Sequence, residues 1–335
     1  MKESAAKLRG GIIGCGFFGR IHLEAWRRIP EARIVAACDL NPELARQSAP
    51  RAFRSAEQML EGEQLDFVDI ATRPESHLPL VRLAAAHKIP AICQKPMAPA
   101  WADAVAMAEA AEAGGIRLMI HENWRWQPWY RAAGRMLEEG RIGRPIAYWF
   151  RTRKRDGDGD APYPNQPYFK RMPRLLIHET LVHHIDTARY LFGEIDTVCA
   201  QARRINPVIA GEDRAVLVLT HREPLEGVID GHRFLDPDPD GPAMGEACFE
   251  GERGRIRIPA AGDVYLRGRK AWANEVSAGY RGDSVGATQR HFIECLKTGK
   301  PFESEAREYL KTFGAVEAAY RSVAERRAVA LSEVL

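Results

Sequence analysis

The stretch "GGIIGCGFFG" at residues 10–19 indicates how the first part of the chain folds. An apolar run leads into glycines with the spacing G-x-G-x-x-G, and a helical pattern follows them. Gly14 permits a tight turn, Gly16 lets a pyrophosphate approach the backbone, and Gly19 lets the helix pack close to the strand. Such glycines can also mark a simple turn, but their place between a strand and a helix favours a dinucleotide-binding loop.

An acidic residue at the end of the next apolar run supports this interpretation. Asp39 lies 20 residues beyond Gly19, where a carboxylate can bind both ribose hydroxyls of an adenosine. The same carboxylate would repel a 2′-phosphate, and the next arginine along the chain is Arg46. The sequence therefore predicts NAD as the cofactor, in preference to NADP.

The chain divides into two patterns. Residues 8–120 alternate short apolar runs with helical segments, which indicates an α/β domain with a doubly wound parallel sheet. We therefore expect residues 1–123 to form a Rossmann NAD-binding domain. Residues 124–335 contain a helix, several strand-like segments and a closing helix at about residues 303–326. We expect them to form a second, substrate-binding domain.

Composition excludes several classes of function. The chain has 335 residues with 45% hydrophobic and 28% charged residues, as in soluble globular proteins. Its net charge of +3 gives no electrostatic reason to expect binding to nucleic acid or to a membrane surface. No apolar run has the length of a membrane span, and the first residues do not read as a signal peptide. Six scattered cysteines indicate a reduced, cytoplasmic protein.

Residues 175–194, "LLIHETLVHHIDTARYLFGE", concentrate imidazoles and carboxylates. His178 and His183 are five residues apart, so on a helix they point about 140° away from each other and do not bind one metal ion together. No metal site is therefore expected. Glu179 lies four residues before His183, and Asp186 three residues after it. A regular helix would place all three on one face.

Five motifs, in this order, resemble the glucose–fructose oxidoreductase / inositol dehydrogenase (Gfo/Idh/MocA) family. They are "GCGFFGRIH", "ATRPESH", "CQKPMAP", "HENWRWQP" and "ETLVHHIDTARYLFGE", and they cover nearly the whole chain. The resemblance implies an N-terminal Rossmann domain and a C-terminal α/β domain with a large, mostly antiparallel sheet. In the family that sheet often joins subunits, so the resemblance implies a homodimer or homotetramer.

The resemblance also implies roles for individual residues. Lys95 matches the catalytic lysine of the family motif E-K-P, while Gln94 stands where the family has a glutamate near the nicotinamide ribose. Gln94 can still hydrogen-bond a hydroxyl but carries no charge. The predicted cofactor contacts are Gly14, Gly16, Phe17, Phe18, Gly19, Asp39, Thr72, Arg73, Pro74, His77, Gln94 and Lys95.

The family pattern D-x-x-x-H-x-x-D appears here with Glu179, His183 and Asp186. Oxidation of a secondary alcohol needs a base for the hydroxyl proton, and histidine suits that role because its unperturbed pKa is near neutral. His183 is the predicted base, Glu179 its orienting carboxylate, and Lys95 stabilises the substrate oxygen. We therefore expect an NAD-dependent oxidoreductase that acts on a polyol, sugar or sugar acid.

Candidate substrate contacts are less closely defined. Arg125 lies at the expected domain junction and is suited to a substrate anion, as is Arg153 on a basic strand. Tyr163, in a loop rich in glycine and proline, is suited to a sugar hydroxyl. Asp186 either binds a substrate hydroxyl or only orients its neighbours. The strand arginines could equally contact another subunit.

Two other functions remain open from the residues alone. A glycosidase of the same fold could use bound NAD for a transient oxidation followed by elimination, with no net NADH. A non-catalytic, NAD-sensing regulator is the second alternative. Loss of Lys95 or His183 would favour the regulator, but both residues are present.

Overall fold

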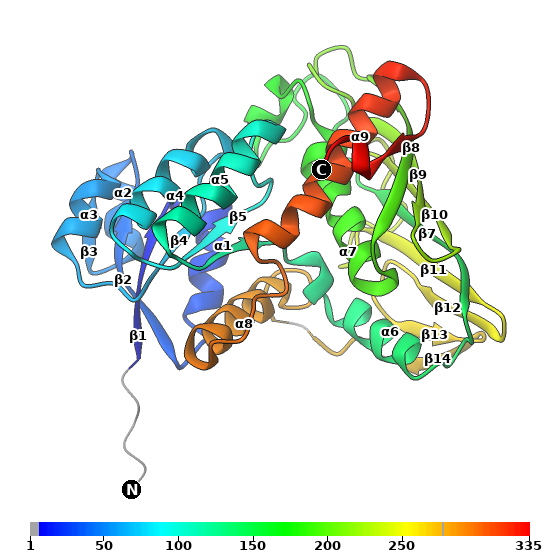
Figure 1. Cartoon of the computed structure of the whole chain (residues 1–335), viewed down its shortest axis with the longest axis horizontal. Coiled ribbons are helices and arrows are strands. Elements are labelled where there is room, and N and C mark those ends of the chain that lie inside the picture. Colours follow the sequence, from blue (N-terminus) through cyan, green and yellow to red (C-terminus); the bar gives the residue numbers. More distant parts are fainter. Residues whose placement is uncertain (1–6, 277) are drawn as a thin grey trace, which may run out of the picture. The chain divides into compact units, whose positions relative to one another are not determined.

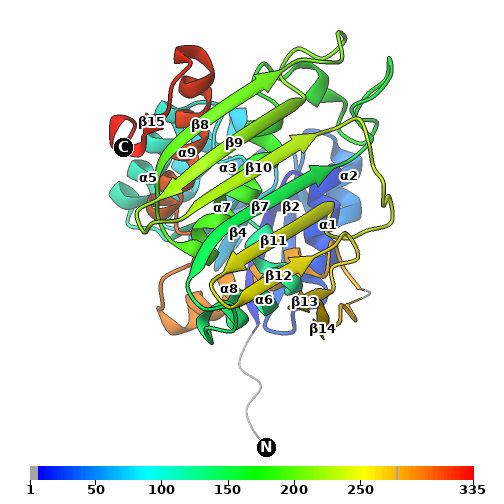
Figure 2. The ribbon, with the colours of Figure 1, turned by 90° about the vertical axis from the view of Figure 1, so that its right-hand side faces the viewer.

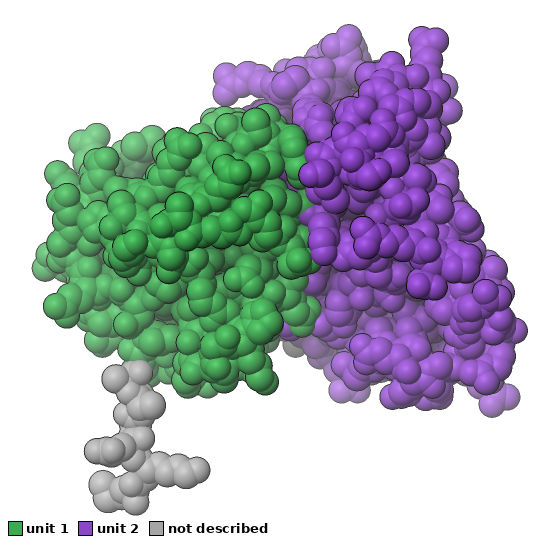
Figure 3. Space-filling model, in the orientation of Figure 1, with its two compact units in different colours: residues 1–123, 283–310 green, residues 124–282, 311–335 purple. Residues whose placement is uncertain are grey.

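The computed structural model describes residues 7–276 and 278–335. The chain forms two compact units, coloured separately in Figure 3. Unit 1 comprises residues 1–123 and 283–310, and unit 2 comprises residues 124–282 and 311–335. The first unit therefore combines two separate stretches of the chain, and residues 283–310 are the second of them. In the described part of the chain, no helix is long and apolar enough to cross a membrane.

Unit 1 contains a six-stranded sheet whose strand pairs are all parallel, with the order β3-β2-β1-β4-β5-β6. The strands are β1 (Leu8–Ile13), β2 (Ala32–Cys38), β3 (Arg51–Phe53), β4 (Phe67–Ile70), β5 (Ala91–Gln94) and β6 (Leu118–His121). The helices are α1 (Phe17–Trp26), α2 (Pro42–Ser48), α3 (Ala56–Gly62), α4 (His77–Ala86), α5 (Trp101–Gly114) and α8 (Ser284–Thr298). Figure 1 shows this part from blue to cyan, with α8 in orange. The strand order is that of a Rossmann fold, which confirms the prediction.

Helix α8 belongs to unit 1 because its apolar side chains complete the core of that unit. Phe292 of α8 packs edge-on against Phe67 of β4, with ring centroids 5.6 Å apart. It also stacks on Phe302 at 5.2 Å. All three rings are buried in one cluster, together with Trp26 of α1. The burial of these aromatic rings supplies the free energy that holds residues 283–310 to the Rossmann sheet.

Unit 2 contains a nine-stranded sheet with the order β14-β13-β12-β11-β7-β10-β9-β8-β15. Only β7 and β10 pair in parallel, so the sheet is mostly antiparallel as expected. Its strands are β7 (Pro145–Arg153), β8 (Ile195–Arg203), β9 (Arg214–His221), β10 (Glu226–His232), β11 (Gly245–Gly251), β12 (Gly254–Ile258), β13 (Val264–Leu266), β14 (Arg269–Trp272) and β15 (Val329–Ala330). The principal helices are α6 (Pro128–Glu138), α7 (Val182–Phe192) and α9 (Ala306–Glu325).

The two faces of this sheet have different neighbours. Along β7, Tyr148, Phe150 and Thr152 are buried. Phe150 packs edge-on against Tyr130 of α6, and Tyr148 stacks on Phe192 of α7 with ring centroids 4.4 Å apart. Because side chains alternate along a strand, Arg151 lies on the opposite face. Figure 2 shows that face towards the viewer, with α6 and α7 behind the sheet.

The segment predicted as one helix over residues 175–194 is not uniform. Residues Leu176–Leu181 form a π-helical turn, and the regular α-helix α7 begins only at Val182. A π-helical turn has i→i+5 hydrogen bonds and often occurs at functional sites. The predicted common face for Glu179 and His183 assumed regular α-helical spacing, and that assumption is wrong across this turn. The local contacts of each side chain therefore decide its orientation.

Candidate active site

The glycine-rich turn of unit 1 has the geometry that a dinucleotide requires. Gly14 has φ +94°, and a Cβ atom there would lie 2.7 Å from the carbonyl oxygen of Ala71. A Cβ atom on Gly19 would overlap the carbonyl oxygen of Gly14, so α1 packs directly on the turn. A Cβ atom on Gly16 would meet nothing within 4 Å, which leaves the backbone of that residue approachable. These are the three roles expected from the sequence.

Asp39 lies beside this turn at the end of β2. Its carboxylate accepts hydrogen bonds from the backbone N–H of Cys15 at 2.7 Å and of Asn41 at 2.8 Å. Arg46 forms an ion pair with Glu43. A carboxylate next to the glycine turn fits the ribose of NAD, and Arg46 already has an acidic partner.

The loop after β4 and the start of α4 carry four of the predicted cofactor residues. His77 is fully buried, and its ring nitrogens lie 3.1 Å from the carbonyl oxygen of Met97 and 3.2 Å from that of Thr72. Burial lowers the pKa of His77. His77 therefore ties the two loops together from inside the unit.

The other three residues of this loop are closer to the surface or to the start of α4. Thr72 is half-buried, and its hydroxyl accepts a hydrogen bond from Ser76 at 2.7 Å. Arg73 is exposed, and Pro74 is buried in the first position of a short 3₁₀ turn. The loop backbone is thus fixed by Ser76 and by the ring of His77.

Gln94 and Lys95, at the end of β5, are both buried. The side-chain oxygen of Gln94 accepts a hydrogen bond from the backbone N–H of Lys95 at 2.6 Å. Its nitrogen lies 3.0 Å from Nε2 of His22. Both ends of the amide therefore bind the protein itself, through His22 and Lys95. His22 was not among the predicted site residues.

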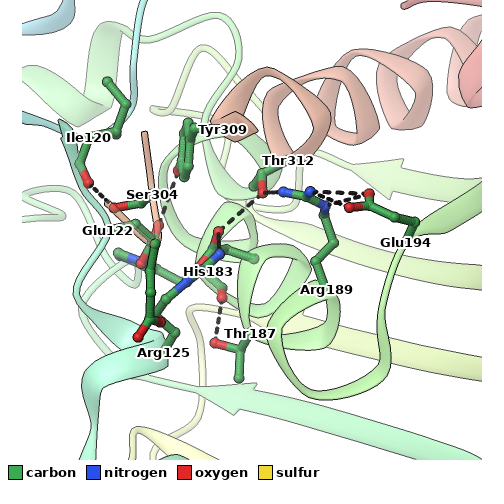
Figure 4. A network of polar contacts seen from close by, with 12 residues as sticks. Ile120, Glu122, Arg125, His183, Thr187, Arg189, Glu194, Ser304, Tyr309 and Thr312 are labelled. Atoms are coloured by element: carbon green, nitrogen blue, oxygen red, sulfur yellow. Dashed lines mark hydrogen bonds and ion pairs between the residues drawn. The ribbon is translucent and has the colours of Figure 1, made fainter. Parts of the chain in front are cut away.

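In unit 2, the ring of His183 is buried and held by an aromatic partner. It stacks on Trp124 with ring centroids 4.6 Å apart and an interplanar angle of 6°. Its carbonyl oxygen accepts a hydrogen bond from the hydroxyl of Thr187 at 2.8 Å (Figure 4). Trp124 belongs to the motif "HENWRWQP", although the sequence did not indicate its contact with His183.

The adjacent histidine has a different environment. His184 contacts Thr152 of β7 through Nε2 and stacks on Phe150 at 4.9 Å. Burial lowers the pKa of His184 to about 3, so its ring stays neutral. His184 thus joins α7 to the sheet, which leaves His183 as the candidate for proton transfer in this segment.

The carboxylate of Glu179 is held by a chain of polar groups. It accepts a hydrogen bond from the hydroxyl of Thr180 at 2.8 Å, and that hydroxyl accepts one from Arg233 at 2.7 Å. Arg233 forms a bidentate pair with Asp156 at 2.6 and 2.7 Å. Burial opposes the charge of Arg233, but Asp156 raises the pKa of the guanidinium so that it stays protonated. Sequence reasoning missed Arg233, which is 53 residues from Thr180.

Tyr163 lies close to this chain of contacts. Its ring centroid is 5.2 Å from the guanidinium carbon of Arg233, and its backbone has φ +59°. The phenol oxygen is buried and has no hydrogen-bond partner among the described residues. A buried hydroxyl without a partner is costly unless a ligand supplies one. This observation agrees with the expected contact between Tyr163 and a substrate hydroxyl.

Two of the predicted substrate residues are instead partners of each other. Arg125 donates to Asp186 through Nε at 2.7 Å and through Nη2 at 2.6 Å, and both side chains are buried. The hydroxyl of Thr312 also donates to Asp186 at 3.1 Å and accepts from Arg189 at 2.7 Å (Figure 4). The charges of Arg125 and Asp186 compensate each other, so the geometry favours a structural role for this pair over the binding of a substrate anion.

Arg153 also has a charged partner within the protein. It lies on the sheet face opposite to α7 and donates to Asp230 of β10 at 2.5 Å. Asp230 also pairs with Arg214 at 2.6 Å. Arg153 therefore belongs to a charged network on the sheet surface, on the other side of the sheet from the helix that carries His183.

These features define a class of protein. The first unit has a Rossmann sheet, a glycine turn and, beside that turn, the carboxylate of Asp39. The second unit has a buried histidine stacked on tryptophan, with a carboxylate fixed in the adjacent π-helical turn. Such a combination is that of an NAD-dependent oxidoreductase with a separate substrate unit.

Comparison with known proteins identifies the family. Residues 8–122 match the family model "Oxidoreductase family, NAD-binding Rossmann fold", and residues 130–257 match "GFO/IDH/MocA C-terminal domain". The chain belongs to the Gfo/Idh/MocA oxidoreductase family, which confirms the resemblance noted in the sequence. It is a dehydrogenase that uses NAD(P) and acts on CH–OH groups, as its named relatives are.

The chain is similar over nearly its whole length to two D-apiose dehydrogenases. One, from Paraburkholderia graminis, is 39% identical over 98% of this chain and 91% of the relative. The other, from Rhizobium rhizogenes, is 34% identical over 98% of this chain and 99% of the relative. An oxidoreductase from Agrobacterium radiobacter, solved in complex with NAD⁺, L-tartaric acid and magnesium, has a TM-score of 0.88 and 34% identity and covers 98% of this chain and 100% of its own.

Proposed function

We propose that this protein oxidises a sugar with NAD as the hydride acceptor and that D-apiose is its first candidate substrate. The observation that carries the proposal is the 39% identity, over 98% of the chain, with a D-apiose dehydrogenase. Lys95 and His183, whose types suit the oxidation of an alcohol, are both present and both buried. The coarser assignment to a polyol, sugar or sugar acid rests on the wider set of relatives, which includes inositol dehydrogenases.

The proposed chemistry follows from the residue types. NAD, when bound, accepts the hydride from the substrate carbon. His183 takes the hydroxyl proton as the general base, and stacking on Trp124 fixes the plane of its ring. Lys95 hydrogen-bonds the same substrate oxygen and stabilises its developing negative charge.

Glu179 and Tyr163 complete the proposed site in unit 2. Glu179 lies in the π-helical turn directly before the helix of the base, and its carboxylate is fixed by Thr180 and by Arg233. The buried hydroxyl of Tyr163 forms a hydrogen bond with a hydroxyl of the substrate. We leave Arg125, Asp186 and Arg153 out of the proposed substrate contacts because each has a charged partner within the protein.

A substrate panel tests this function. The purified protein is incubated with NAD and with D-apiose, myo-inositol, common pentoses and sugar acids, and NADH formation is followed. D-Apiose is expected to have the highest kcat/KM. A glycoside that is cleaved without net NADH would show the glycosidase alternative, and the absence of turnover with every compound would contradict the proposal.

We expect NAD to be preferred over NADP because of Asp39. Replacing Asp39 with alanine removes a charged hydrogen-bond acceptor, and hydrogen bonds to a charged group are worth about 1.5–3 kcal/mol. The kcat/KM for NAD should therefore fall about 10- to 100-fold, and the preference over NADP should shrink. Asp39→Asn is the matched control, because its side-chain oxygen can still accept from Cys15 while the negative charge is lost. Wild-type protein that uses NADP as well as NAD would contradict this prediction.

We also propose that the protein self-associates through the open face of the nine-stranded sheet. Val228 and Val218 are exposed there and are directly paired between β10 and β9, and Trp149 is the partner of Val228 on β7. This apolar stripe lies next to the Arg153–Asp230 ion pair, so the surface offers both signs of charge. A second copy of the same face would be complementary to it.

Sedimentation velocity tests this surface. The wild-type protein is expected to sediment as a dimer or tetramer, and Val228→Glu should shift it towards the monomer. Leu40→Glu is the control, because Leu40 is an exposed apolar residue of unit 1, outside the sheet. A monomeric wild type, or an unchanged assembly in Val228→Glu, would exclude this face as the interface.

A further inference from the structure

A chain of buried hydrogen bonds leads from Asp69 of β4 to the backbone of Lys95. Nδ1 of His22, on α1, lies 2.8 Å from the carboxylate of Asp69. Nε2 of the same ring lies 3.0 Å from the side-chain nitrogen of Gln94. The side-chain oxygen of Gln94 is 2.6 Å from the backbone nitrogen of Lys95. Asp69 and His22 have no exposed surface at all.

The direction of each hydrogen bond in this chain is determined. The backbone N–H of Lys95 can only donate, so the atom of Gln94 that faces it must be the oxygen. The amide nitrogen of Gln94 then donates to Nε2 of His22, which must accept. A neutral imidazole with an accepting Nε2 carries its proton on Nδ1, and that proton is donated to Asp69. One backbone N–H therefore fixes the tautomer of His22, through Gln94.

Further contacts hold the ring and the carboxylate in place. The indole N–H of Trp26 donates to Asp69 at 2.6 Å, and the side chain of Gln289 donates to the carbonyl oxygen of His22 at 3.2 Å. A group displaced from this buried position would leave a polar partner unsatisfied, at a cost of about 1–3 kcal/mol. The surroundings thus favour one arrangement of His22 and Asp69.

The titratable groups around His22 come from three strands. Asp69 of β4 is its hydrogen-bond partner, and the ring of His121 of β6 lies 4.1 Å away, centroid to centroid. Cys93 of β5 is near Asp69, and burial raises the pKa of its thiol, so it stays neutral. The partner of Nε2, Gln94, carries no charge.

We propose that His22 is a positioning residue for Lys95. As the Nδ1–H tautomer, bound to Asp69, it orients the amide of Gln94, which in turn holds the backbone of Lys95 at the end of β5. This inference rests on the proposed role of Lys95 in stabilising the substrate oxygen. It also links the residue at position 94 to the protonation of His22: an amide requires a neutral ring, whereas a carboxylate could face Nε2 only with one additional proton.

The spectrum of the histidine side chains tests the hydrogen-bond directions without any activity measurement. Nitrogen-15 NMR of the full chain, with the His22 signal assigned by comparison with His22→Asn, should show a ring that is protonated at Nδ1 and not at Nε2. In Gln94→Glu, the pair at positions 22 and 94 should hold one more proton. A wild-type ring protonated at Nε2, or at both nitrogens, would overturn the inference.

The extra proton expected in Gln94→Glu should make the stability of this variant depend on pH. The folded variant binds a proton that the unfolded chain releases more readily, so the relevant pKa is higher in the folded state. The contribution of this proton to stability is therefore present at low pH and lost as the pH rises through the folded-state pKa. The Tm of Gln94→Glu, relative to wild type, should fall with rising pH. If the difference in Tm between Gln94→Glu and wild type did not change with pH, the proposed dependence of His22 protonation on the residue at position 94 would be wrong.

Kinetics test the positioning role. His22→Ala is expected to lower kcat about 10- to 100-fold, because a small displacement of a catalytic group is enough for such a loss, while the KM for NAD changes little. Trp26→Phe is the matched control: it also removes a buried hydrogen bond to Asp69 but leaves the link from His22 to Gln94 intact. It should lower Tm and reduce kcat much less than His22→Ala does. Equal kcat in the two variants would reduce His22 to a structural residue.

Different results would refute the proposed role of Lys95 and the positioning role of His22. Wild-type kcat in Lys95→Ala would refute the proposed role of Lys95, while the NMR spectrum would still report the tautomer of His22. Loss of kcat in Lys95→Ala together with wild-type kcat in His22→Ala would refute only the positioning role.

Discussion

Replacing His183 with alanine is expected to lower kcat by about 100- to 10,000-fold, the contribution that a general base usually makes. The ring is buried and stacked on Trp124, so alanine removes both the proton acceptor and its fixed position. NAD should still bind, because the glycine turn and Asp39 belong to the other unit. Steady-state kinetics with D-apiose, together with NAD titration, measure the two effects separately. Lys95→Ala should give a comparable loss of kcat.

Two neighbouring residues provide controls for this result. His184→Gln alters an adjacent histidine that is bonded to Thr152, so it should lower stability with little effect on kcat. Glu179→Gln keeps an acceptor for the hydroxyl of Thr180 and should cost less than the loss of His183. If His183→Ala retained most of the wild-type kcat, His183 would not be the base.

Replacing Arg125 with methionine is expected to lower the free energy of unfolding by about 3–5 kcal/mol, as is usual when one member of a buried ion pair is removed. Asp186 would be left buried without its bidentate partner, and only Thr312 among its described donors would remain. Denaturant unfolding of the wild type and the variant measures the difference.

The double variant Arg125→Met/Asp186→Leu separates this explanation from a simple packing defect. It removes both charges, so most of the lost stability should return. The exposed pair Arg144–Glu252 is a second control, and Arg144→Met should cost less than about 1 kcal/mol. If Arg125→Met had wild-type stability but a raised KM for acidic substrates only, Arg125 would be a substrate residue, as the sequence suggested.

The Rossmann unit was predictable because its signals are local. Buried parallel strands appear in the sequence as continuous apolar runs, and the close packing at Gly14 and Gly19 leaves no room for a side chain. Asp39 was predictable for the same reason, since it follows directly on β2. The short strand β3, with three residues, carries no such signal and depends on its pairing with β2.

The placement of residues 283–310 was not predictable from their own pattern. An amphipathic helix such as α8 must bury an apolar face, but its sequence does not say against which sheet. Contact of Phe292 with Phe67 of β4 decides that question. These two rings come from distant parts of the chain, so only the folded core brings them together.

In the candidate site, too, some features could be predicted from the sequence and others depend on the tertiary structure. The resemblance to the family motifs was enough to select Lys95, His183 and Glu179 as candidates, and their residue types suit the required chemistry. The tertiary structure alone decided that Arg125 pairs with Asp186, 61 residues away, and that His22 pairs with Asp69, 47 residues away. Hydrogen bonds between buried groups depend on packing in three dimensions, and sequence separation does not specify them.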